Sequence, residues 1–306
     1  MGTRPGRALP AFTPIPPILD DEGAAELPFA GLDTLWLQLT GTLCNIACRH
    51  CFITCGPRED RVPMMTRQRL EEVLCEAREL GVKEYYFTGG EPMLHPEFYE
   101  LCERTLEQGP LSILTNGILI DDPAAARLRA LFDRARYSLD LRVSLDGMTE
   151  HENDPVRGRG TFAQITAGIA ALTRAGLSPV LTVVEHSQGL RAQEARLQFL
   201  DFARGLGLPR ARIKFLPLLH LGREERRTRG YEAGEVVSGP LDADVAAALQ
   251  CTSSRLATQD GVLTCPLLLD APEARMGRGL RESLRPIRLR WAACHTCVAE
   301  GLSCRT

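Results

Sequence analysis

The chain has 306 residues, of which 44% are hydrophobic and 25% are charged. These are ordinary globular values, so a wholly disordered or fibrous chain is excluded. The 36 Lys and Arg against 39 Asp and Glu leave a formal net charge of −3, which is no electrostatic footprint for nucleic acid. No apolar run approaches the roughly 18 residues that a membrane span requires, and several prolines between residues 10 and 17 interrupt any signal-peptide core. We therefore expect a cytoplasmic protein without nucleic-acid or membrane partners.

The first two thirds of the chain alternate between strand-like and helix-like segments. Residues 1–33 are rich in proline and small residues, which predicts an irregular N-terminal arm. The expected strands are Thr34–Leu39, Glu84–Thr88, Leu111–Thr115, Leu139–Leu145, Pro179–Glu185 and Arg212–Leu218. The expected helices lie near 66–80, 96–108, 122–135, 161–175 and 191–206. This alternation predicts an α/β fold of βαβ units with a parallel sheet, either as an open doubly wound sheet or as an incomplete barrel.

Local signals predict where some of these helices begin and end. Thr66 is expected to start the first helix and Gly81 to stop it. Asp122 followed by Pro123 predicts a cap residue with proline at the first helical position.

The sequence pattern changes after residue 220. Arg223–Arg229 is a dense run of charges that we expect on a solvated face or loop. Asp260-Gly261 between short apolar runs is a strong signal for a β-hairpin. Apolar runs are so few here that the segment needs a cross-link for stability. The expected division is 1–33 for the arm, 34–220 for the α/β domain and 221–306 for a small appended module.

The first of two cysteine groups has a spacing that is typical of metal or redox chemistry. The chain has 11 cysteines and no export signal, so a disulfide framework is not expected. Cys44, Cys48 and Cys51 form C-x3-C-x2-C directly after the first strand, where loops of parallel sheets carry chemistry. Three such thiolates suit an iron–sulfur cluster with one open iron, whereas a structural zinc site would close all four positions. Cys55 is a candidate fourth ligand.

A glycine-rich step ends the second strand, in the segment Thr88-Gly89-Gly90-Glu91-Pro92. The two glycines let the backbone approach a ligand closely, and Glu91 places an acceptor beside it. Alone, the segment could be an ordinary turn at a strand exit. This segment follows the cysteine motif by one βα unit, and the two motifs together are far more specific than the segment alone.

With these two motifs, the sequence over about residues 34–218 resembles the radical S-adenosylmethionine (SAM) superfamily. The resemblance implies a partial (β/α)6 barrel of the TIM type. It also implies that Cys44, Cys48 and Cys51 bind three irons of a [4Fe–4S] cluster, while the amino and carboxylate groups of SAM chelate the fourth. An electron from such a cluster would cleave SAM to methionine and a 5′-deoxyadenosyl radical, which abstracts a hydrogen atom from a substrate.

The resemblance also implies which residues contact SAM. Gly89, Gly90 and Glu91 would match the family's contact to the SAM amino group. His50 stands where the family usually has an aromatic residue that packs on adenine, and an imidazole can also stack. The remaining candidates are Thr115, Asn116, Ser144, Asp146 and Arg157. For Ser144 and Asp146, which could meet the SAM ribose, capping of a turn or helix is an alternative, and Arg157 could meet the SAM carboxylate.

The second cysteine group contains Cys251, Cys265, Cys294, Cys297 and Cys304. Cys251 and Cys265 flank the expected hairpin, so their side chains could converge, and Cys294 and Cys297 form a close pair that clusters and zinc both favour. A zinc ribbon is therefore one interpretation. The resemblance to members with SPASM or shorter twitch extensions implies instead one auxiliary [4Fe–4S] cluster. Cys251, Cys265, Cys294 and Cys297 would close it, with Cys304 either spare or in place of one of them.

The resemblance implies an enzyme whose reaction is an oxidation, an epimerisation or a bond formation. The 33 residues before the first strand are too few for the leader-binding domain of many peptide-modifying members. This favours a small molecule, such as a sugar or aminocyclitol in specialised metabolism, with a peptide as the alternative substrate. A flavodoxin or ferredoxin would supply the electron. The alternative of another class is a non-catalytic iron–sulfur or zinc protein, and no motif identifies the substrate or a catalytic acid or base.

Overall fold

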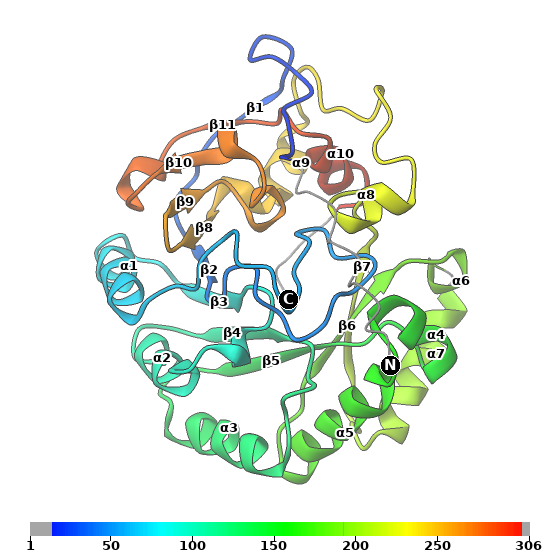
Figure 1. Ribbon diagram of the computed structural model, residues 1–306. Helices are drawn as coiled ribbons and strands as arrows, with labels where there is room; N and C mark the ends of the chain where they lie inside the picture. Colours follow the sequence, from blue (N-terminus) through cyan, green and yellow to red (C-terminus); the bar gives the residue numbers. More distant parts are fainter. Residues whose placement is uncertain (1–13, 192, 302–306) are drawn as a thin grey trace, which may run out of the picture.

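The computed structural model describes residues 14–191 and 193–301 of the chain, and all the expected strands of the α/β domain are present in it (Figure 1). They are β2 (Thr34–Gln38), β3 (Glu84–Thr88), β4 (Leu111–Thr115), β5 (Leu139–Ser144), β6 (Val180–Glu185) and β7 (Arg212–Pro217). The expected helices correspond to α1 (Arg67–Glu79), α2 (Phe98–Leu106), α3 (Asp122–Arg134), α5 (Thr161–Arg174) and α7 (Gln193–Gly205). No helix among the described residues is long and apolar enough to span a membrane.

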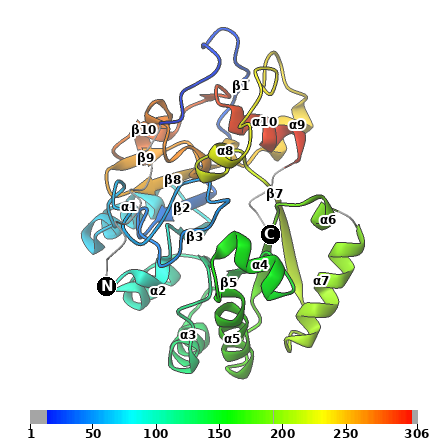
Figure 2. The same cartoon turned by 45° about the vertical axis from the view of Figure 1, so that its right-hand side comes forward.

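The order of the strands decides between the two predicted architectures. Strands β2 to β7 are parallel, and each is hydrogen-bonded to the next one in the chain. A doubly wound sheet reverses its strand order at a switch point, and this sheet does not. It curves instead, with the helices on its outer side (Figures 1 and 2). The predicted partial (β/α)6 barrel is therefore confirmed.

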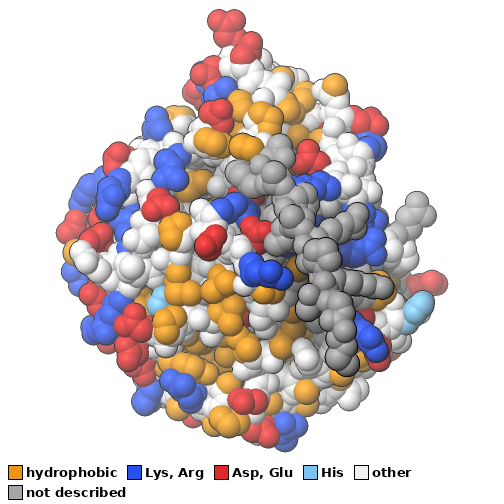
Figure 3. Space-filling view, in the orientation of Figure 1, with side chains coloured by type: hydrophobic (Ala, Val, Ile, Leu, Met, Phe, Trp, Pro, Cys, Tyr) orange, Lys and Arg blue, Asp and Glu red, His pale blue; other side chains and the backbone are white. Residues whose placement is uncertain are grey.

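The two faces of each barrel strand have different surroundings because successive side chains point to opposite sides. Leu35 and Leu37 belong to the main core together with helix residues such as Leu70. Trp36, between them, faces the inner side, where its ring stacks on Tyr86 with centroids 4.3 Å apart. The rim of the face in Figure 3 carries many charged side chains, while hydrophobic ones gather nearer its middle.

Two of the three expected helix boundaries are confirmed and one is wrong by a residue. Thr66 caps α1 by accepting a hydrogen bond from the N–H of Arg69 at 3.2 Å, and Gly81 follows the helix with φ +72°. The cap of α3 is Asp121 rather than Asp122, since its carboxylate accepts from the N–H of Ala124 at 2.8 Å. Asp121 lies three residues before Ala124, the spacing at which the side chain of a cap residue reaches a free N–H in the first turn of a helix.

Helices α4 (Glu150–Arg157) and α8 (Arg223–Arg227) are among those that lie in segments where no helix was expected. Helix α4 contains Pro155 and few apolar residues, so it lacks the periodicity that marked the other helices. Helix α8 forms within the charge run that we expected on a solvated face or loop. One member of that run, Glu224, is buried and pairs with Arg227.

The C-terminal segment extends the barrel sheet. The hairpin at Asp260-Gly261 is confirmed, since β8 (Ser254–Thr258) pairs antiparallel with β9 (Gly261–Leu263). Strand β8 also pairs in parallel with β2, so the described sheet runs β10-β9-β8-β2-β3-β4-β5-β6-β7. The first barrel strand is thereby covered rather than left as an open edge.

The remaining short elements surround this extension. They are α6 (Gln188–Arg191), α9 (Ala243–Ala248), β10 (Arg275–Gly277), β11 (Ile287–Arg288) and α10 (Ala292–Ala299). The described part of the N-terminal arm joins them through β1 (Glu26–Leu27), which pairs antiparallel with β11. Ile15, near the start of the described chain, packs in one hydrophobic cluster with Cys265, Cys294 and Cys297, and the last two of these cysteines lie on α10 near the end of the described chain.

Candidate functional site

The first cysteine group lies in the loop between β2 and α1, and backbone hydrogen bonds hold this loop in place. The N–H of Cys44 donates to the carbonyl of Gly56 at 3.1 Å, and the N–H of Arg49 donates to that of Val156 at 2.7 Å. The thiol groups of Cys44, Cys48 and Cys51 interact electrostatically with one another. The fold thus brings the three predicted ligands together.

The three thiols differ in how readily they ionise. Burial raises the pKa of Cys44 to about 12 and that of Cys48 to about 11. The pKa of Cys51 is lowered to about 6, chiefly because the Cys55 side chain donates a hydrogen bond to it. The N–H of Cys55 also donates to Cys51 Sγ at 3.3 Å. Metal coordination would ionise all three thiols, and Cys55 contacts one of them directly.

The glycine step after β3 packs against the backbone of the cysteine loop. A Cβ atom on Gly90 would lie 2.0 Å from the carbonyl oxygen of Leu43, and one on Gly89 would lie 2.4 Å from Thr40 Oγ1. The N–H of Glu91 donates to that same Leu43 carbonyl at 3.0 Å. The close approach that the two glycines permit is therefore to the loop that carries the cysteines.

Glu91 is fully buried and is held by groups from the end of β4. Its carboxylate accepts hydrogen bonds from Thr115 Oγ1 and from the N–H of Asn116, both at 2.7 Å, and from the N–H of Met93 at 3.2 Å. Burial raises the pKa of Glu91 to about 7 even though these hydrogen bonds oppose it. The carboxylate is thus fixed in direction and costly to keep charged without a cation.

Asn116 links this carboxylate to the cysteine loop. Its side-chain amide donates to Asn45 Oδ1 at 2.7 Å and lies 3.8 Å from Cys44 Sγ. The predicted residues Thr115 and Asn116 therefore contact Glu91 and the cysteine loop.

The carboxylate of Asp146 contacts residues from three other segments. Its buried carboxylate forms ion pairs with Arg157 Nε at 2.7 Å and with His50 Nε2 at 2.6 Å, and accepts from the N–H of Val184 at 2.8 Å. Burial raises the pKa of Asp146, but Arg157 and His50 outweigh it and hold that pKa well below its usual range. Both carboxylate oxygens are engaged, so Asp146 orients His50 and Arg157. Ser144 is half-buried at the end of β5.

Four cysteines of the second group line one pocket. Its lining includes Cys251 before β8, Cys265 after β9, and Cys294 and Cys297 on α10, with leucine and tryptophan side chains between them. The cavity between them has a volume of about 30 Å³. Burial raises the pKa of Cys294 to about 12. Cys304 lies outside the described residues.

Four thiols around one pocket are the donor set of both interpretations, a structural Zn²⁺ site and a [4Fe–4S] cluster.

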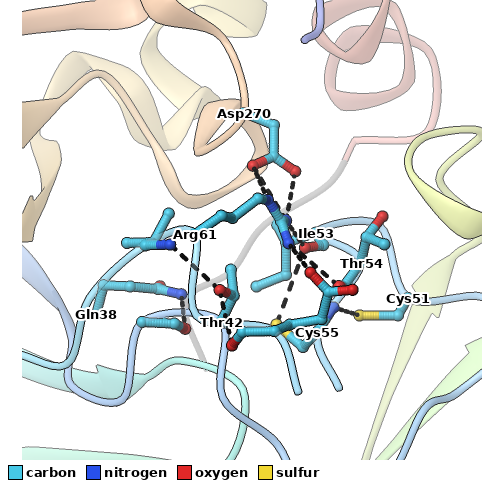
Figure 4. A network of polar contacts seen from close by, with 11 residues as sticks. Gln38, Thr42, Cys51, Ile53, Thr54, Cys55, Arg61 and Asp270 are labelled. Carbon is cyan, nitrogen blue, oxygen red and sulfur yellow. Dashed lines mark hydrogen bonds and ion pairs between the residues drawn. The ribbon is translucent and has the colours of Figure 1, made fainter. Parts of the chain in front are cut away.

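Arg61 connects the first cysteine loop to the segment that carries the second group (Figure 4). Its guanidinium donates to the carbonyls of Ile53 and Thr54, the latter at 3.3 Å. It also pairs with the buried carboxylate of Asp270 at 2.9 Å. Asp270 follows Cys265 by five residues in the sequence, so this contact fixes the two cysteine-bearing segments relative to each other.

We expect Asp270→Asn to lower the free energy of unfolding by about 1.5–3 kcal/mol, because it weakens a charged hydrogen bond that is largely buried. Chemical denaturation of the purified protein measures this loss. The control is Asp133→Asn, which removes an exposed i,i+4 pair with Arg129 and should leave the free energy of unfolding close to that of wild type. Equal losses in the two variants would contradict a connecting role for Asp270.

Comparisons with known proteins agree with this site. The family model of the radical SAM superfamily matches residues 39–187. The mycofactocin maturase MftC of Mycobacterium ulcerans (strain Agy99) is 35% identical over 150 residues, which are 48% of this chain and 39% of that protein. The GTP 3′,8-cyclase of Moorella thermoacetica is 29% identical over 208 residues, 65% of this chain and 59% of that protein. The chain thus spans less than two thirds of the length of these relatives.

Solved structures show the same fold at low sequence identity. Streptococcus suis SuiB bound to precursor peptide SuiA has a TM-score of 0.59 and 15% identity, with 81% of this chain and 62% of that chain covered. Native anSMEcpe with bound AdoMet and Cp18Cys peptide has a TM-score of 0.58 and 16% identity, with 82% and 79% covered. The family match includes the cysteine loop and Glu91, and the curved sheet is that of these structures. Residues 39–187 of this chain are thus similar in sequence to the radical SAM superfamily.

Proposed function

We propose that this chain cleaves SAM reductively at a [4Fe–4S] cluster held by Cys44, Cys48 and Cys51, and that the substrate loses a hydrogen atom at the mouth of the barrel. The observation that carries the proposal is the placement of Glu91. Its carboxylate is buried, fixed by three hydrogen bonds and joined through its own N–H to the cysteine loop. A carboxylate in this position is suited to receive an ammonium group beside three thiolates.

The residues around the cysteine loop would position SAM. When bound, the cluster and SAM supply an electron and a 5′-deoxyadenosyl radical. Glu91, at the step that also contains Gly89 and Gly90, would accept hydrogen bonds from the SAM ammonium. Arg157 is buried beside the loop and interacts electrostatically with Cys44 and Cys48, so its charge would attract the SAM carboxylate. His50, which Asp146 orients, would lie against the adenine.

An auxiliary [4Fe–4S] cluster bound by Cys251, Cys265, Cys294 and Cys297 is the second part of the proposal. These thiols line one pocket, and soft thiolates are the ligands that such clusters use. The cluster would accept the second electron of an oxidation or shape the substrate site. In this interpretation 34–220 is the SAM-binding barrel and 221–306 the cluster-binding module.

The substrate that we propose is a small molecule of the sugar or aminocyclitol type. A peptide is the second candidate, because 150 residues of the chain are 35% identical to a protein named as a mycofactocin maturase. The fold is also shared with SuiB, a structure of which is described as bound to a precursor peptide. A flavodoxin or ferredoxin would be the electron donor for either substrate.

The test of the proposed activity is anaerobic reconstitution with iron and sulfide, followed by dithionite and SAM. We expect 5′-deoxyadenosine to form, and faster with the true substrate than without one. Protein that is fully loaded with iron but forms no 5′-deoxyadenosine under any of these conditions would be a non-catalytic iron–sulfur protein.

Glu91→Gln should weaken SAM binding while the cluster is retained. The substitution removes a charge-assisted contact worth about 1.5–3 kcal/mol, or roughly a 10- to 150-fold loss of affinity. Equilibrium binding of SAM to the reconstituted protein measures the loss, and iron content shows that the cluster is intact. The matched control is Glu84→Gln at the opposite end of β3, which should leave SAM affinity unchanged.

The same contact predicts a pH dependence. Because burial raises the pKa of Glu91 to about 7, the carboxyl of the SAM-free protein becomes protonated as the pH falls below that value. SAM affinity should therefore fall between about pH 8 and about pH 6 in the wild type, and Glu91→Gln should lack this component. Equal pH dependence of SAM affinity in wild type and Glu91→Gln would show that Glu91 is only a turn residue. Equal SAM affinity of the two proteins at about pH 8 would show the same.

A further inference from the structure

Arg255 in β8 is completely buried, and its hydrogen-bonding groups are satisfied by backbone carbonyls. Its Nη1 donates to the carbonyls of Cys251 and Ser254, both at 2.7 Å. Its Nε donates to the carbonyl of Ser283 at 3.0 Å, and its Nη2 donates to that of Arg285 at 2.9 Å. A fixed guanidinium is therefore hydrogen-bonded to the backbone of Cys251, one of the four cysteines that line the pocket.

The carbonyls satisfy the hydrogen bonds of Arg255 but carry no negative charge, and among the described residues no carboxylate forms an ion pair with it. The acidic groups that act on it electrostatically are the thiols of Cys251 and Cys265, while Arg285 adds a further positive charge. The face of the Phe29 ring lies 4.3 Å from the guanidinium carbon and contributes a weak attraction. A buried cation without an anionic partner destabilises the folded protein by several kcal/mol. The charge of Arg255 would therefore favour the binding of a negatively charged group in the pocket.

We infer that Arg255 is the fixed positive charge that balances the thiolate ligands of the Cys251–Cys265–Cys294–Cys297 pocket and raises the reduction potential of the group bound there. The inference rests on the proposed auxiliary cluster. A cluster with four thiolate ligands is anionic and becomes more so when it gains an electron, so a buried cation nearby favours the reduced form. Arginine is suited to this role because it stays charged at every physiological pH.

If Arg255 has this role, its charge rather than its hydrogen bonds sets the reduction potential of the bound group. Arg255→Met keeps much of the side-chain volume and removes the charge, whereas Arg255→Lys keeps the charge and loses most of the hydrogen bonds. The matched control is Arg69→Met. Arg69 is also buried and also donates to β8, at the carbonyl of Thr258, but it has a carboxylate partner in Glu72.

The experiment is a redox titration of the full-length, iron-loaded enzymes, followed by electron paramagnetic resonance. The signal that changes when SAM is added identifies the first cluster, which serves as an internal reference. In Arg255→Met we expect the oxidised-to-reduced ratio of the auxiliary cluster at a fixed potential to rise at least tenfold, equal to a 59 mV decrease for one electron. Arg255→Lys and Arg69→Met should stay within about threefold of wild type, about half a decade on that scale.

An unchanged auxiliary potential in a loaded Arg255→Met enzyme overturns the inference, since a purely structural arginine would alter stability alone. If Arg255→Met does not fold, Arg255→Lys decides, because a tenfold change despite the retained charge also overturns it. Wild-type protein that binds iron only at the first site would refute the auxiliary cluster itself. That failure is visible before any Arg255 variant is made, so the two claims are tested separately.

Discussion

Replacement of Cys44, Cys48 and Cys51 together by Ala should abolish SAM cleavage and remove about four irons per chain, while about four irons should remain at the second cysteine group. We expect this result because the two groups are separate in the structure. The first lies in the β2–α1 loop, and the second lines a pocket between β8, β9 and α10. Among the described residues, neither group contributes a side chain to the other.

Iron and sulfide content and the yield of 5′-deoxyadenosine are the measurements for this variant. Cys75→Ala is the control, since Cys75 is an exposed residue of α1 outside both groups, and it should keep the iron content and activity of wild type. A triple variant that binds no iron at all would refute the picture of two independent clusters.

Cys297→Ala should lose the auxiliary cluster, whereas Cys304→Ala should keep the full iron content. Cys294 and Cys297 lie three residues apart on α10, so their side chains share one face of the helix, and both line the pocket. Binding of metal and local folding are coupled in such small units. We therefore expect α10 to lose protection from hydrogen exchange in Cys297→Ala, while β8 keeps its pairing with β2.

Iron and sulfide counts on the two variants, together with hydrogen exchange, test this assignment. Loss of about four irons in Cys304→Ala, with Cys297→Ala unaffected, would make Cys304 a ligand in place of Cys297. Protection that disappears across β8 as well as α10 would show that the cluster stabilises the sheet extension and not the helix alone.

Local patterns in the sequence were sufficient to predict most of the barrel. Strand β3 is found at the residues expected from its apolar run, and α1 begins after the predicted cap Thr66. These predictions succeeded because side-chain periodicity and capping act between residues that are near in the chain. Helix α4 was missed for the same reason, because it contains a proline and is held by its tertiary surroundings.

Spacing in the sequence also predicted which cysteines would be ligands, but it did not predict the contacts that hold the surrounding residues. Asp146, which the resemblance assigned to the SAM ribose, is engaged by His50 and Arg157 from distant segments. The charge balance at Arg255 had no sequence signal at all, since its partners are backbone carbonyls that every residue possesses.

The sequence by itself determined the order of strands and helices, the two cysteine groups and the resemblance of residues 39–187 to the radical SAM superfamily. Only the tertiary structure decided that β8 joins the barrel at β2, that Glu91 is fixed by the end of β4, and that Arg61 connects the two cysteine-bearing segments. The physical reason is the range of the interactions. Periodicity and caps act within a few residues, whereas strand pairing and buried ion pairs join residues far apart in the chain and depend on the geometry of the completed fold.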